Sequence, residues 1–349
     1  MVIDIMDYSV RVGIIGYGFM GSTHARLIRE KKLAELRAIS DIDEKALYKA
    51  REENREVKIY TNPLELIRDK NIDAVIIATP PTTHVDLLLK SIDHGKHVLV
   101  EKPLATSIRE LDKLLEHEIP RDLVVMVGYS LRYHRMYIDL KKFMEKLGRI
   151  YFFHHTALGG MPSAGWIRDP SLSGGMLNEN AVHILYLFYW YFGEPRRIYA
   201  TLESKTAPGI DDNILLVSEH GSENNKTTAS LLRSWTANQV IRYFEVLGEN
   251  GSIHVDGYLG GKVRMVIGGE TMEYNYETII DEMYTNELKD FFDSITSIKQ
   301  PQVTLKDGVV IQLMVEAAKK SNTTGSPVEM SKITGGSISK LLGRLNNLY

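Results

Sequence analysis

The fold of the first part of this chain is decided by residues 10–21, which read VRVGIIGYGFMG. A β-branched run predicts a strand, three glycines follow it at once, and residues 23–31 then show a helical apolar pattern. Glycines at this spacing suit a tight turn, close approach of the backbone to a pyrophosphate, and close packing of the helix on the strand. The helix N-terminus offers oriented N–H groups to phosphates. The stretch therefore predicts a dinucleotide site with contacts at Gly16, Tyr17, Gly18, Phe19, Met20 and Gly21.

An acidic residue near this loop predicts which dinucleotide binds. Asp41 ends the next predicted strand, twenty residues after Gly21. A carboxylate at that place accepts a hydrogen bond from the ribose 2′-hydroxyl of NAD and repels the 2′-phosphate of NADP. The residue after it, Ile42, is apolar and not the arginine that a phosphate would favour. Asp41 and Ile42 therefore predict NAD as the cofactor, while Lys45 and Arg51 nearby leave NADP open.

Strands and helices of about 10 residues alternate along the first third of the chain, which is typical of βαβ units and a parallel sheet. The strands predicted after the first are 36–40, 74–78, 97–100 and 123–127. The pattern then changes to alternating apolar and polar residues with glycine and asparagine turns, which predicts a largely antiparallel sheet. These later strands are 198–203, 214–219, 227–234, 241–247, 252–256, 262–267 and 271–274, with helices at 133–147, 175–192, 284–298 and 309–322.

The fold class is therefore α/β, and the change of pattern sets the predicted domain boundaries. A length of 349 residues suits two domains. We expect a doubly wound parallel-sheet domain that binds the dinucleotide at residues 8–125 and a second domain at residues 126–334. Residues 335–349 are expected to form a C-terminal tail.

The composition excludes several kinds of site and partner. Lysine and arginine number 42 and aspartate and glutamate 45, so the net charge of −3 offers no basic surface for a nucleic acid or an acidic membrane. The chain has no cysteine, which excludes disulfides, cysteine-ligated zinc and a cysteine nucleophile. The longest apolar stretch, 181–192, is too short to span a bilayer, and residues 1–9 lack a leader pattern. These features predict a cytoplasmic protein.

Two further segments follow later strands of the predicted parallel sheet. Thr79, Pro80 and His84 come after one strand, and Glu101 and Lys102 come after the next. Ligands of an open parallel sheet bind outside the carboxyl ends of its strands, so we expect these five residues at the cofactor. Lys102 is the candidate functional cation, although a lysine in a turn is more commonly just solvated.

Glu179 and His183 form a second candidate site. They are four residues apart on the helix predicted to start near Gly175, so they should share one of its faces. A carboxylate beside a histidine can orient the ring and bring its pKa toward neutrality, which suits proton transfer to or from an alcohol. A zinc site and a merely packed histidine are the alternatives. No third ligand occurs at helical spacing, so we expect no metal.

Several motifs follow one another in a characteristic order. They are Gly-x-Gly-x-x-Gly at 16–21, Thr-Pro-x-x-x-His at 79–84, Glu-Lys-Pro at 101–103, Trp-x-Arg-Asp-Pro at 166–170, Gly-Gly-x-Leu-x-Glu-x-x-x-His at 174–183 and Gly-Glu-Pro at 193–195. Over roughly residues 10–330 the chain resembles the glucose-fructose oxidoreductase/inositol dehydrogenase (Gfo/Idh/MocA) family. The resemblance implies an N-terminal Rossmann domain and a C-terminal α/β domain with a large open, mainly antiparallel sheet. It also implies a homodimer or homotetramer formed through that sheet.

The resemblance further implies an NAD(P)-dependent oxidoreductase that transfers a hydride between the cofactor and a hydroxyl-bearing carbon of a sugar, inositol or related polyol. Lys102 matches the family lysine that contacts the reacting hydroxyl, and His183 matches the histidine proposed as acid/base. Glu179 stands where many members have aspartate, and so does Tyr186. The residues expected to line the substrate are Arg132, Tyr133, Trp166 and Arg168, for which packing or surface roles are the alternative.

Two other functions stay open at this point. An oxidase or ketoreductase of nucleotide-linked sugars would need a phosphate-binding surface, for which Arg132, Arg135 and Arg168 are the nearby candidates. A non-catalytic, dinucleotide-responsive regulatory protein would need only the glycine loop. The presence of both Lys102 and His183 favours an enzyme, in which these two residues and Glu179 are catalytic.

Overall fold

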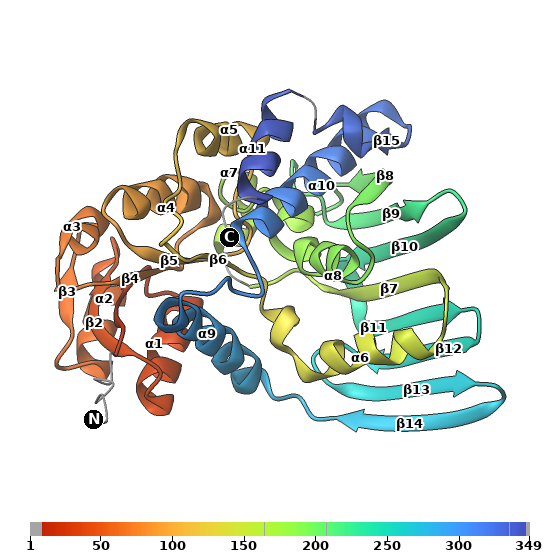
Figure 1. Cartoon of the computed structure of the whole chain (residues 1–349), viewed down its shortest axis with the longest axis horizontal. Coiled ribbons are helices and arrows are strands. Elements are labelled where there is room, and N and C mark those ends of the chain that lie inside the picture. The colour runs from red at the N-terminus through yellow and green to blue at the C-terminus, as the bar shows by residue number, and fades with distance from the viewer. Residues whose placement is uncertain (1–8, 164, 207, 335, 347–349) are drawn as a thin grey trace, which may run out of the picture.

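The computed structural model describes residues 9–163, 165–206, 208–334 and 336–346. It contains a six-stranded parallel sheet and a nine-stranded, mainly antiparallel sheet, which lie side by side in Figure 1. The predicted fold class is therefore confirmed. The expected start of the first domain at residue 8, most of the stretch examined for a leader, and the last residues of the tail lie outside the described part. None of the described helices is both long and apolar enough to cross a membrane.

The first sheet has the strand order β3-β2-β1-β4-β5-β6. Its strands are β1 (Arg11–Ile15), β2 (Glu35–Ser40), β3 (Lys58–Tyr60), β4 (Ala74–Ile77), β5 (His97–Glu101) and β6 (Val125–Gly128). Its helices are α1 (Phe19–Lys31), α2 (Glu44–Glu53), α3 (Pro63–Arg68), α4 (His84–Asp93) and α5 (Ile108–Glu116). The order reverses between β1 and β4, which is where ligands bind in doubly wound sheets. The sequence pattern misses β3, because three residues are too few to show a period.

The second sheet has the order β14-β13-β12-β11-β7-β10-β9-β8-β15. Its strands are β7 (Ile150–Gly160), β8 (Pro195–Glu203), β9 (Asn213–Ser222), β10 (Asn225–Ser234), β11 (Thr236–Gly248), β12 (Gly251–Gly257), β13 (Gly261–Ile267), β14 (Glu270–Tyr276) and β15 (Val328–Glu329). β7 pairs parallel with β10 and antiparallel with β11. The first strand of this sheet along the chain therefore lies in the middle of the sheet.

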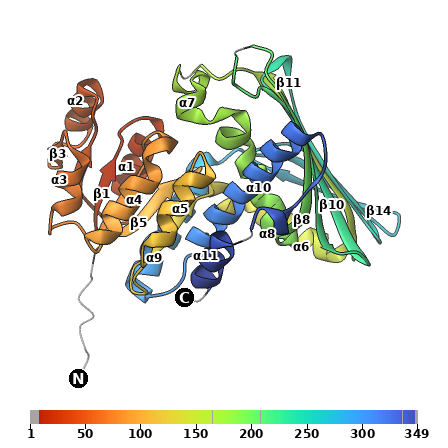
Figure 2. The ribbon, with the colours of Figure 1, turned by 90° about the horizontal axis from the view of Figure 1, so that it is seen from above.

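Helices from the second half of the chain join the two sheets. They are α6 (Arg135–Lys146), α7 (Pro170–Ser173), α8 (Val182–Phe192), α9 (Ile280–Ser297), α10 (Leu305–Thr324) and α11 (Ser337–Asn346). α9 returns to pack against α1, whereas α10 packs on β8 and also reaches β6. Figure 2 shows α10 running between the two sheets. The predicted tail therefore contains a helix, α11, which packs on α5.

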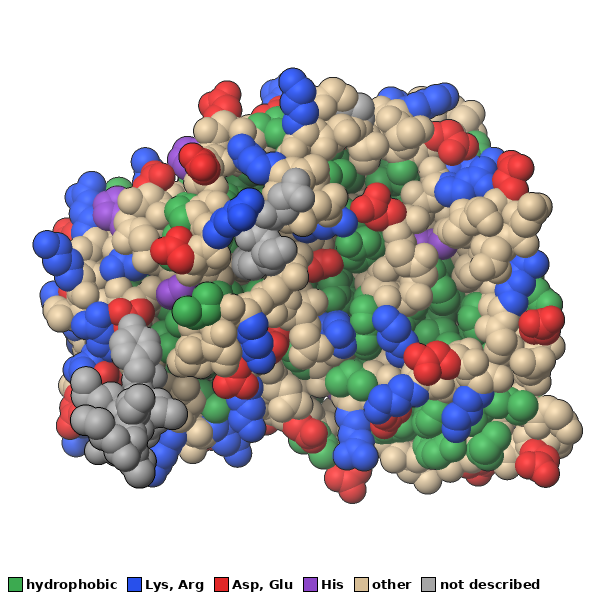
Figure 3. Space-filling view, in the orientation of Figure 1, with side chains coloured by type: hydrophobic (Ala, Val, Ile, Leu, Met, Phe, Trp, Pro, Cys, Tyr) green, Lys and Arg blue, Asp and Glu red, His purple; other side chains and the backbone are tan. Residues whose placement is uncertain are grey.

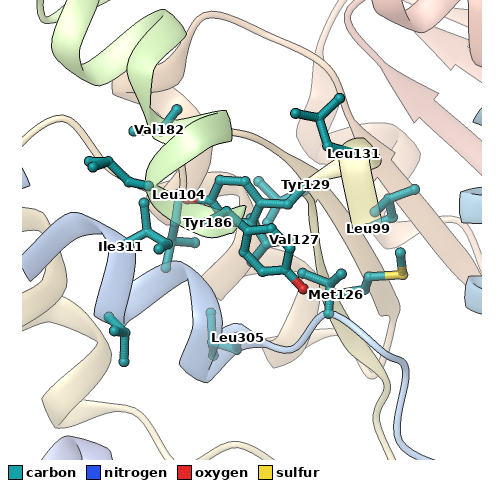
Figure 4. Packing of buried hydrophobic residues seen from close by; sticks show 14 of the residues in the cluster. Leu99, Leu104, Met126, Val127, Tyr129, Leu131, Val182, Tyr186, Leu305 and Ile311 are labelled. Carbon is teal, nitrogen blue, oxygen red and sulfur yellow. The ribbon is translucent and has the colours of Figure 1, made fainter. Parts of the chain in front are cut away.

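The junction between the sheets is a continuous apolar core. Tyr129, which follows β6, stacks on Tyr186 of α8 with ring centroids 4.7 Å apart and an angle of 4° between the ring planes. Figure 4 shows the pair surrounded by aliphatic side chains from both halves of the chain, including Leu305 and Ile311 of α10. Tyr186 is 2% exposed. An aromatic ring at this position, where many relatives are expected to carry aspartate, therefore serves packing.

Removing this ring should weaken the junction. We expect Tyr186→Ala to lower the free energy of unfolding by about 3–5 kcal/mol, because it leaves a cavity beside Tyr129. Tyr186→Phe keeps the stacked ring and should change the free energy by much less. Urea denaturation followed by circular dichroism measures both values. Equal stability of the alanine and phenylalanine variants would contradict this role.

Candidate active site

The three glycines of the loop after β1 differ in what surrounds them. Gly16 has φ +91°, and a Cβ there would lie 2.5 Å from the carbonyl oxygen of Ala78. A Cβ on Gly21 would lie 1.8 Å from the carbonyl oxygen of Gly16. Gly18 has nothing within 4 Å of that position. The loop thus has a tight turn, a close helix contact and an open backbone surface, which is the arrangement that a bound pyrophosphate requires.

The amino end of α1 and Asp41 complete a cradle that fits NAD. Gly18 is the N-cap residue and provides no side-chain hydrogen bond, so the end of α1 can face an anion. Asp41 accepts hydrogen bonds from the backbone N–H of Tyr17 at 2.6 Å and of Asp43 at 2.8 Å. These contacts fix the carboxylate at the end of β2, beside the loop. Ile42 next to it is exposed.

The side chain of Tyr17 turns away from this cradle. Its hydroxyl donates to Glu53 at 2.7 Å and accepts from the amide of Asn54 at 2.7 Å. Burial and then the hydrogen bond to Glu53 raise the pKa of Tyr17 to about 12, against the opposite effect of the hydrogen bond from Asn54. Only the backbone of Tyr17 is therefore directed to the loop, whereas Phe19 is 80% exposed and Met20 is half-buried.

His84 lies in the protein interior and links two of the strand-end segments. One ring nitrogen is 2.8 Å from the carbonyl oxygen of Thr79 and the other is 2.7 Å from that of Pro103. Burial lowers its pKa. These contacts give His84 a positioning role, and its predicted contact with the cofactor stays a prediction. It ties together the segments that follow β4 and β5, while Thr79 and Pro80 remain accessible at the sheet edge.

Lys102 connects the first sheet to the second half of the chain. It follows β5, and its Nζ donates to Glu179 Oε1 at 2.9 Å and to the backbone oxygen of Glu179 at 2.7 Å. The side chains of Lys102 and Glu179 are 14% and 12% exposed. This contact brings together two predicted catalytic residues that are 77 positions apart in the sequence.

The turn that carries Glu179 is π-helical, η4 (Leu177–Ala181), and not the start of one regular helix over 175–192. Two left-handed glycines precede it, and a Cβ on Gly175 would lie 1.6 Å from Asp211 Oδ1. The backbone N–H of Leu177 donates to Asp211 Oδ2 at 2.7 Å. Asp211 thus fixes the beginning of this turn. A wider π turn also changes which side chains share a face.

His183 sits on the first turn of α8 and is half-buried. Its Nδ1 has no hydrogen-bond partner among the described residues. The prediction that Glu179 orients this ring is therefore wrong, because Glu179 is engaged by Lys102. Burial lowers the pKa of His183 well below its usual value, and the charges of Lys102 and Arg233 lower it further. The imidazole is thus neutral at pH 7 and can accept a proton.

The expected substrate-lining residues divide into two groups. Trp166 and Arg168 lie exposed on η3 (Gly165–Arg168), and the following α7 packs against η1 (Pro81–Thr83) at the edge of the first sheet. Tyr133 is buried, and its hydroxyl donates to Asp290 of α9 at 2.8 Å, so it joins helices and does not line the site. Arg132 lies over the ring of Trp190, 4.1 Å from its centroid.

Two of the three arginines proposed for a phosphate surface already have partners within the protein. Arg132 is stacked on Trp190, and Arg135 is on α6, where it pairs with Asp139 at 3.6 Å. A separate cavity of about 610 Å³ lies between α6, β14 and α9. Figure 3 shows apolar side chains gathered on this side of the molecule, over β13 and β14.

Glu101 belongs to a buried cluster at the end of β5, and its predicted contact with the cofactor stays a prediction. Its Oε1 lies 2.7 Å from His24 Nε2 on α1. Glu287 of α9 completes the cluster, with both carboxylate oxygens buried and without a hydrogen-bond partner among the described residues. Burial, then the charges of Glu101 and Asp290, raise the pKa of Glu287 well above its usual value. Glu287 therefore keeps its proton to a higher pH in the folded protein than in the unfolded chain.

The same three residues are the group, among those described, whose donor atoms are close enough to hold a metal ion. One ligand atom from each of His24, Glu101 and Glu287 lies within 4.8 Å of the others. The expectation of no metal rested on Glu179 and His183 and did not consider this cluster. The buried carboxyl groups need either a proton or a cation, and the raised pKa of Glu287 favours the proton.

Arg233 of β10 is the residue near the site that sequence reasoning missed. It is 4% exposed, and its Nε and Nη2 are buried without a hydrogen-bond partner among the described residues. Its charge reaches His183, whose pKa it helps to lower. A signal was present in the sequence, because an arginine occupies an inward position of an alternating strand between Leu231 and Trp235. Only the pairing of β10 with β7 shows which residues lie beside Arg233.

Fold and site together define a dinucleotide-dependent oxidoreductase, and comparison with known proteins identifies the family. Residues 10–129 match the model described as "Oxidoreductase family, NAD-binding Rossmann fold" (GFO_IDH_MocA), and residues 139–254 match the GFO/IDH/MocA C-terminal domain. The chain belongs to this family of NAD-dependent oxidoreductases, as the resemblance in the sequence implied.

Similar proteins match almost the whole chain. A myo-inositol 2-dehydrogenase of Thermotoga maritima is 27% identical over 93% of this chain and 100% of its own length. A scyllo-inositol 2-dehydrogenase (NAD(+)) of Bacillus subtilis is 28% identical over 93% of this chain and 97% of its own. The crystal structure of a probable dehydrogenase from Thermotoga maritima has a TM-score of 0.79 and 26% identity, covering 93% of this chain and 100% of that one. A levoglucosan dehydrogenase complex with NADH shares the fold, with a TM-score of 0.83 at 22% identity, over 93% of this chain and 99% of that one.

The buried acid Glu287 makes stability depend on pH. In the unfolded chain its carboxyl group ionises above the ordinary pKa of 4.5, whereas in the folded protein it keeps its proton. Unfolding then releases a proton, so its contribution to stability falls as pH rises above that value, by up to about 1.4 kcal/mol per pH unit. Glu287→Gln cannot ionise. We expect it to gain stability over the wild type between about pH 5 and pH 8.

Urea denaturation at about pH 5 and about pH 8 measures the free energy of unfolding of Glu287→Gln and of the wild type. Glu282→Gln, an exposed position on the same helix, is the matched control and should follow the wild type. A Glu287→Gln variant whose stability changes with pH as the wild type does would refute the proposed neutral state of Glu287.

Proposed function

We propose that this enzyme oxidises a hydroxyl-bearing carbon of a sugar, inositol or related polyol, or reduces the corresponding ketone. The observation that carries the proposal is the position of Lys102. Its ammonium group is held at the carboxyl edge of the first sheet, after β5, which is separated by β4 alone from the strand that leads into the glycine loop. Its charge also reaches His183. The inositol dehydrogenases among its relatives support this class of substrate.

Two residues of the chain would handle the proton of the reacting hydroxyl. His183 is neutral, so an unprotonated ring nitrogen can accept the proton as the C–H bond breaks. Lys102 would donate a hydrogen bond to the substrate oxygen and stabilise its developing negative charge. Glu179 holds the lysine in place through both its carboxylate and its backbone oxygen. When NAD is bound, its nicotinamide ring supplies the acceptor for the hydride.

Replacing Lys102 tests the assignment. Lys102→Ala should lower kcat by about 10²–10⁴-fold, since the developing oxyanion loses its cation. The glycine loop and Asp41 are untouched, so NAD affinity should remain close to that of the wild type. Turnover is measured by absorbance of the reduced cofactor with inositols and free sugars, and NAD affinity by calorimetry. The control is Lys113→Ala, an exposed lysine paired with Asp86.

A fully active Lys102→Ala enzyme would overturn the assignment of Lys102. A wild-type protein that binds NAD but turns over no polyol or sugar would favour the regulatory function instead. Such a protein should have a partner that recognises only the NAD-loaded form.

We also propose that the second sheet forms a homodimer or homotetramer interface. Leu215 and Leu232 are paired neighbours on β9 and β10 and are 42% and 37% exposed. Phe152 and Leu247 are paired on β7 and β11 and are 53% and 47% exposed. These four strands are consecutive in the sheet, so the pairs form one apolar face. Such a face is typical of a surface that another subunit covers.

Light scattering after gel filtration tests this interface. The wild type should be a dimer or tetramer, and Leu215→Asp combined with Leu232→Asp should shift it to a smaller species, because two charges would be buried in the contact. Ile298→Asp, an exposed apolar residue away from the sheet, is the control. A monomeric wild type would contradict the proposal.

We place the enzyme in the cytoplasm, because its cofactor NAD is a metabolite of the cell interior. Cell fractionation followed by detection of the protein tests this location. Recovery of the protein outside the cytoplasmic fraction would contradict it.

A further inference from the structure

Arg233 belongs to a row of side chains on the inner face of the second sheet. Its backbone partner on β7 is Ala157, whose partner on the other side is Arg242 of β11. The two arginines therefore flank a small residue and point to the same face of the sheet. Their guanidinium carbons lie 5.7 Å and 5.9 Å from the ring centroid of Tyr258.

This pair of arginines has no acidic partner among the described residues. No ion pair joins Arg233 or Arg242 to a carboxylate anywhere in the part of the chain that the structure describes. The Nε and Nη2 groups of Arg233 donate to nothing there. Burying an unpaired charge is costly, so such groups are normally paired or meet a ligand. The nearby acid Glu179 is already used by Lys102.

The lowered pKa values of His183 and His155 indicate the same excess of positive charge. After burial itself, the groups that lower the pKa of His183 are Lys102 and Arg233. Arg233, His154 and Arg242 do the same for His155, which lies one row further along β7 with both ring nitrogens unpartnered among the described residues. Two cations, Lys102 and Arg233, therefore act on the proton acceptor of the proposed reaction, and no carboxylate is among the charges that shift the pKa of either histidine.

We propose that Arg233 receives an anionic group of the substrate, a carboxylate or a phosphate ester, and that the enzyme acts on an acidic sugar or polyol. A guanidinium group can bind either anion through two parallel N–H donors. A neutral polyol would leave the charge of Arg233 buried without compensation. Arg242, which is exposed at the end of the same row, adds a second cation on the side open to solvent.

The anion would also assist the proton transfer. His183 gains a positive charge when it accepts the hydroxyl proton, and Lys102 and Arg233 oppose that charge. A carboxylate or phosphate bound to Arg233 offsets one of these two cations. Binding of the correct substrate would then make the imidazole a better base than it is in the free enzyme, so Arg233 couples recognition to chemistry.

The experiment compares substrates that differ in one group. The wild type with NAD is assayed with D-glucose, D-glucuronate and D-glucose 6-phosphate, with D-galactose and D-galacturonate, and with myo-inositol. We expect kcat/KM for an acidic member to exceed that of its neutral counterpart by about 100-fold. The uronates and the sugar phosphate distinguish a carboxylate from a phosphate as the recognised group.

Variants of Arg233 then locate the preference. Arg233→Gln should lower the ratio of kcat/KM for the acidic substrate to kcat/KM for the neutral one by about 100-fold, because only the acidic substrate loses a bound partner, whereas His183 loses an opposing cation with either substrate. Arg233→Lys keeps the charge but loses the two-pronged contact, and should fall in between. The control is Arg264→Gln on β13, an exposed arginine paired with Glu273. It should behave as the wild type.

This inference rests on the proposed function, and binding separates the two. Calorimetry with the NADH-loaded protein measures affinity for D-glucuronate and D-glucose 6-phosphate without turnover. Binding that Arg233→Gln abolishes supports the inference even if no compound is oxidised, an outcome that would count against the proposed function alone. The inference is overturned if the protein binds neither anion, or if Arg233→Gln leaves the ratio of acidic to neutral substrate unchanged.

Discussion

The contact on which the rest of this structure depends is the one between Lys102 and Glu179. It joins the carboxyl end of a strand in the nucleotide-binding sheet to a π turn that belongs to the second half of the chain. The lysine donates to both a carboxylate and a carbonyl oxygen, so its ammonium group has two fixed partners and one free direction. The cofactor edge and His183 are thereby held in one place, which is what a reaction between two bound molecules requires.

Two separate clusters of charged residues lie near this contact. In the first, the acids Glu101 and Glu287 are buried together, and a proton on Glu287 reduces their repulsion. In the second, Lys102 and Arg233 lower the pKa of His183, and Arg233 and Arg242 lower the pKa of His155. The acidic cluster is thus satisfied within the protein, whereas the basic one is left for a ligand to complete.

Local signals in the sequence predicted most of the nucleotide-binding half, except β3. The glycine spacing and the alternation of strands and helices depend on residues close together in the chain, so they predict β1 and α1 correctly and place Asp41 at the end of β2, beside the loop. The chemistry of Lys102 and His183 was predicted from their motifs, and the structure brings these residues to one region. What failed was the assumption of regular helix geometry at Glu179, because Asp211 and two left-handed glycines shape that turn. Arg233 could not be found either, since its importance follows from the pairing of β10 with β7.

The central claim is that the chain removes a hydride from a carbon that bears a hydroxyl group and passes it to NAD. The most direct test supplies NAD and carbon-deuterated forms of myo-inositol, D-glucose and D-glucuronate, and measures deuterium in the reduced cofactor by mass spectrometry. The account predicts one deuterium in the nicotinamide ring for whichever compound is oxidised. Reduced cofactor that carries no deuterium, or no reduction with any of the three compounds, would contradict it.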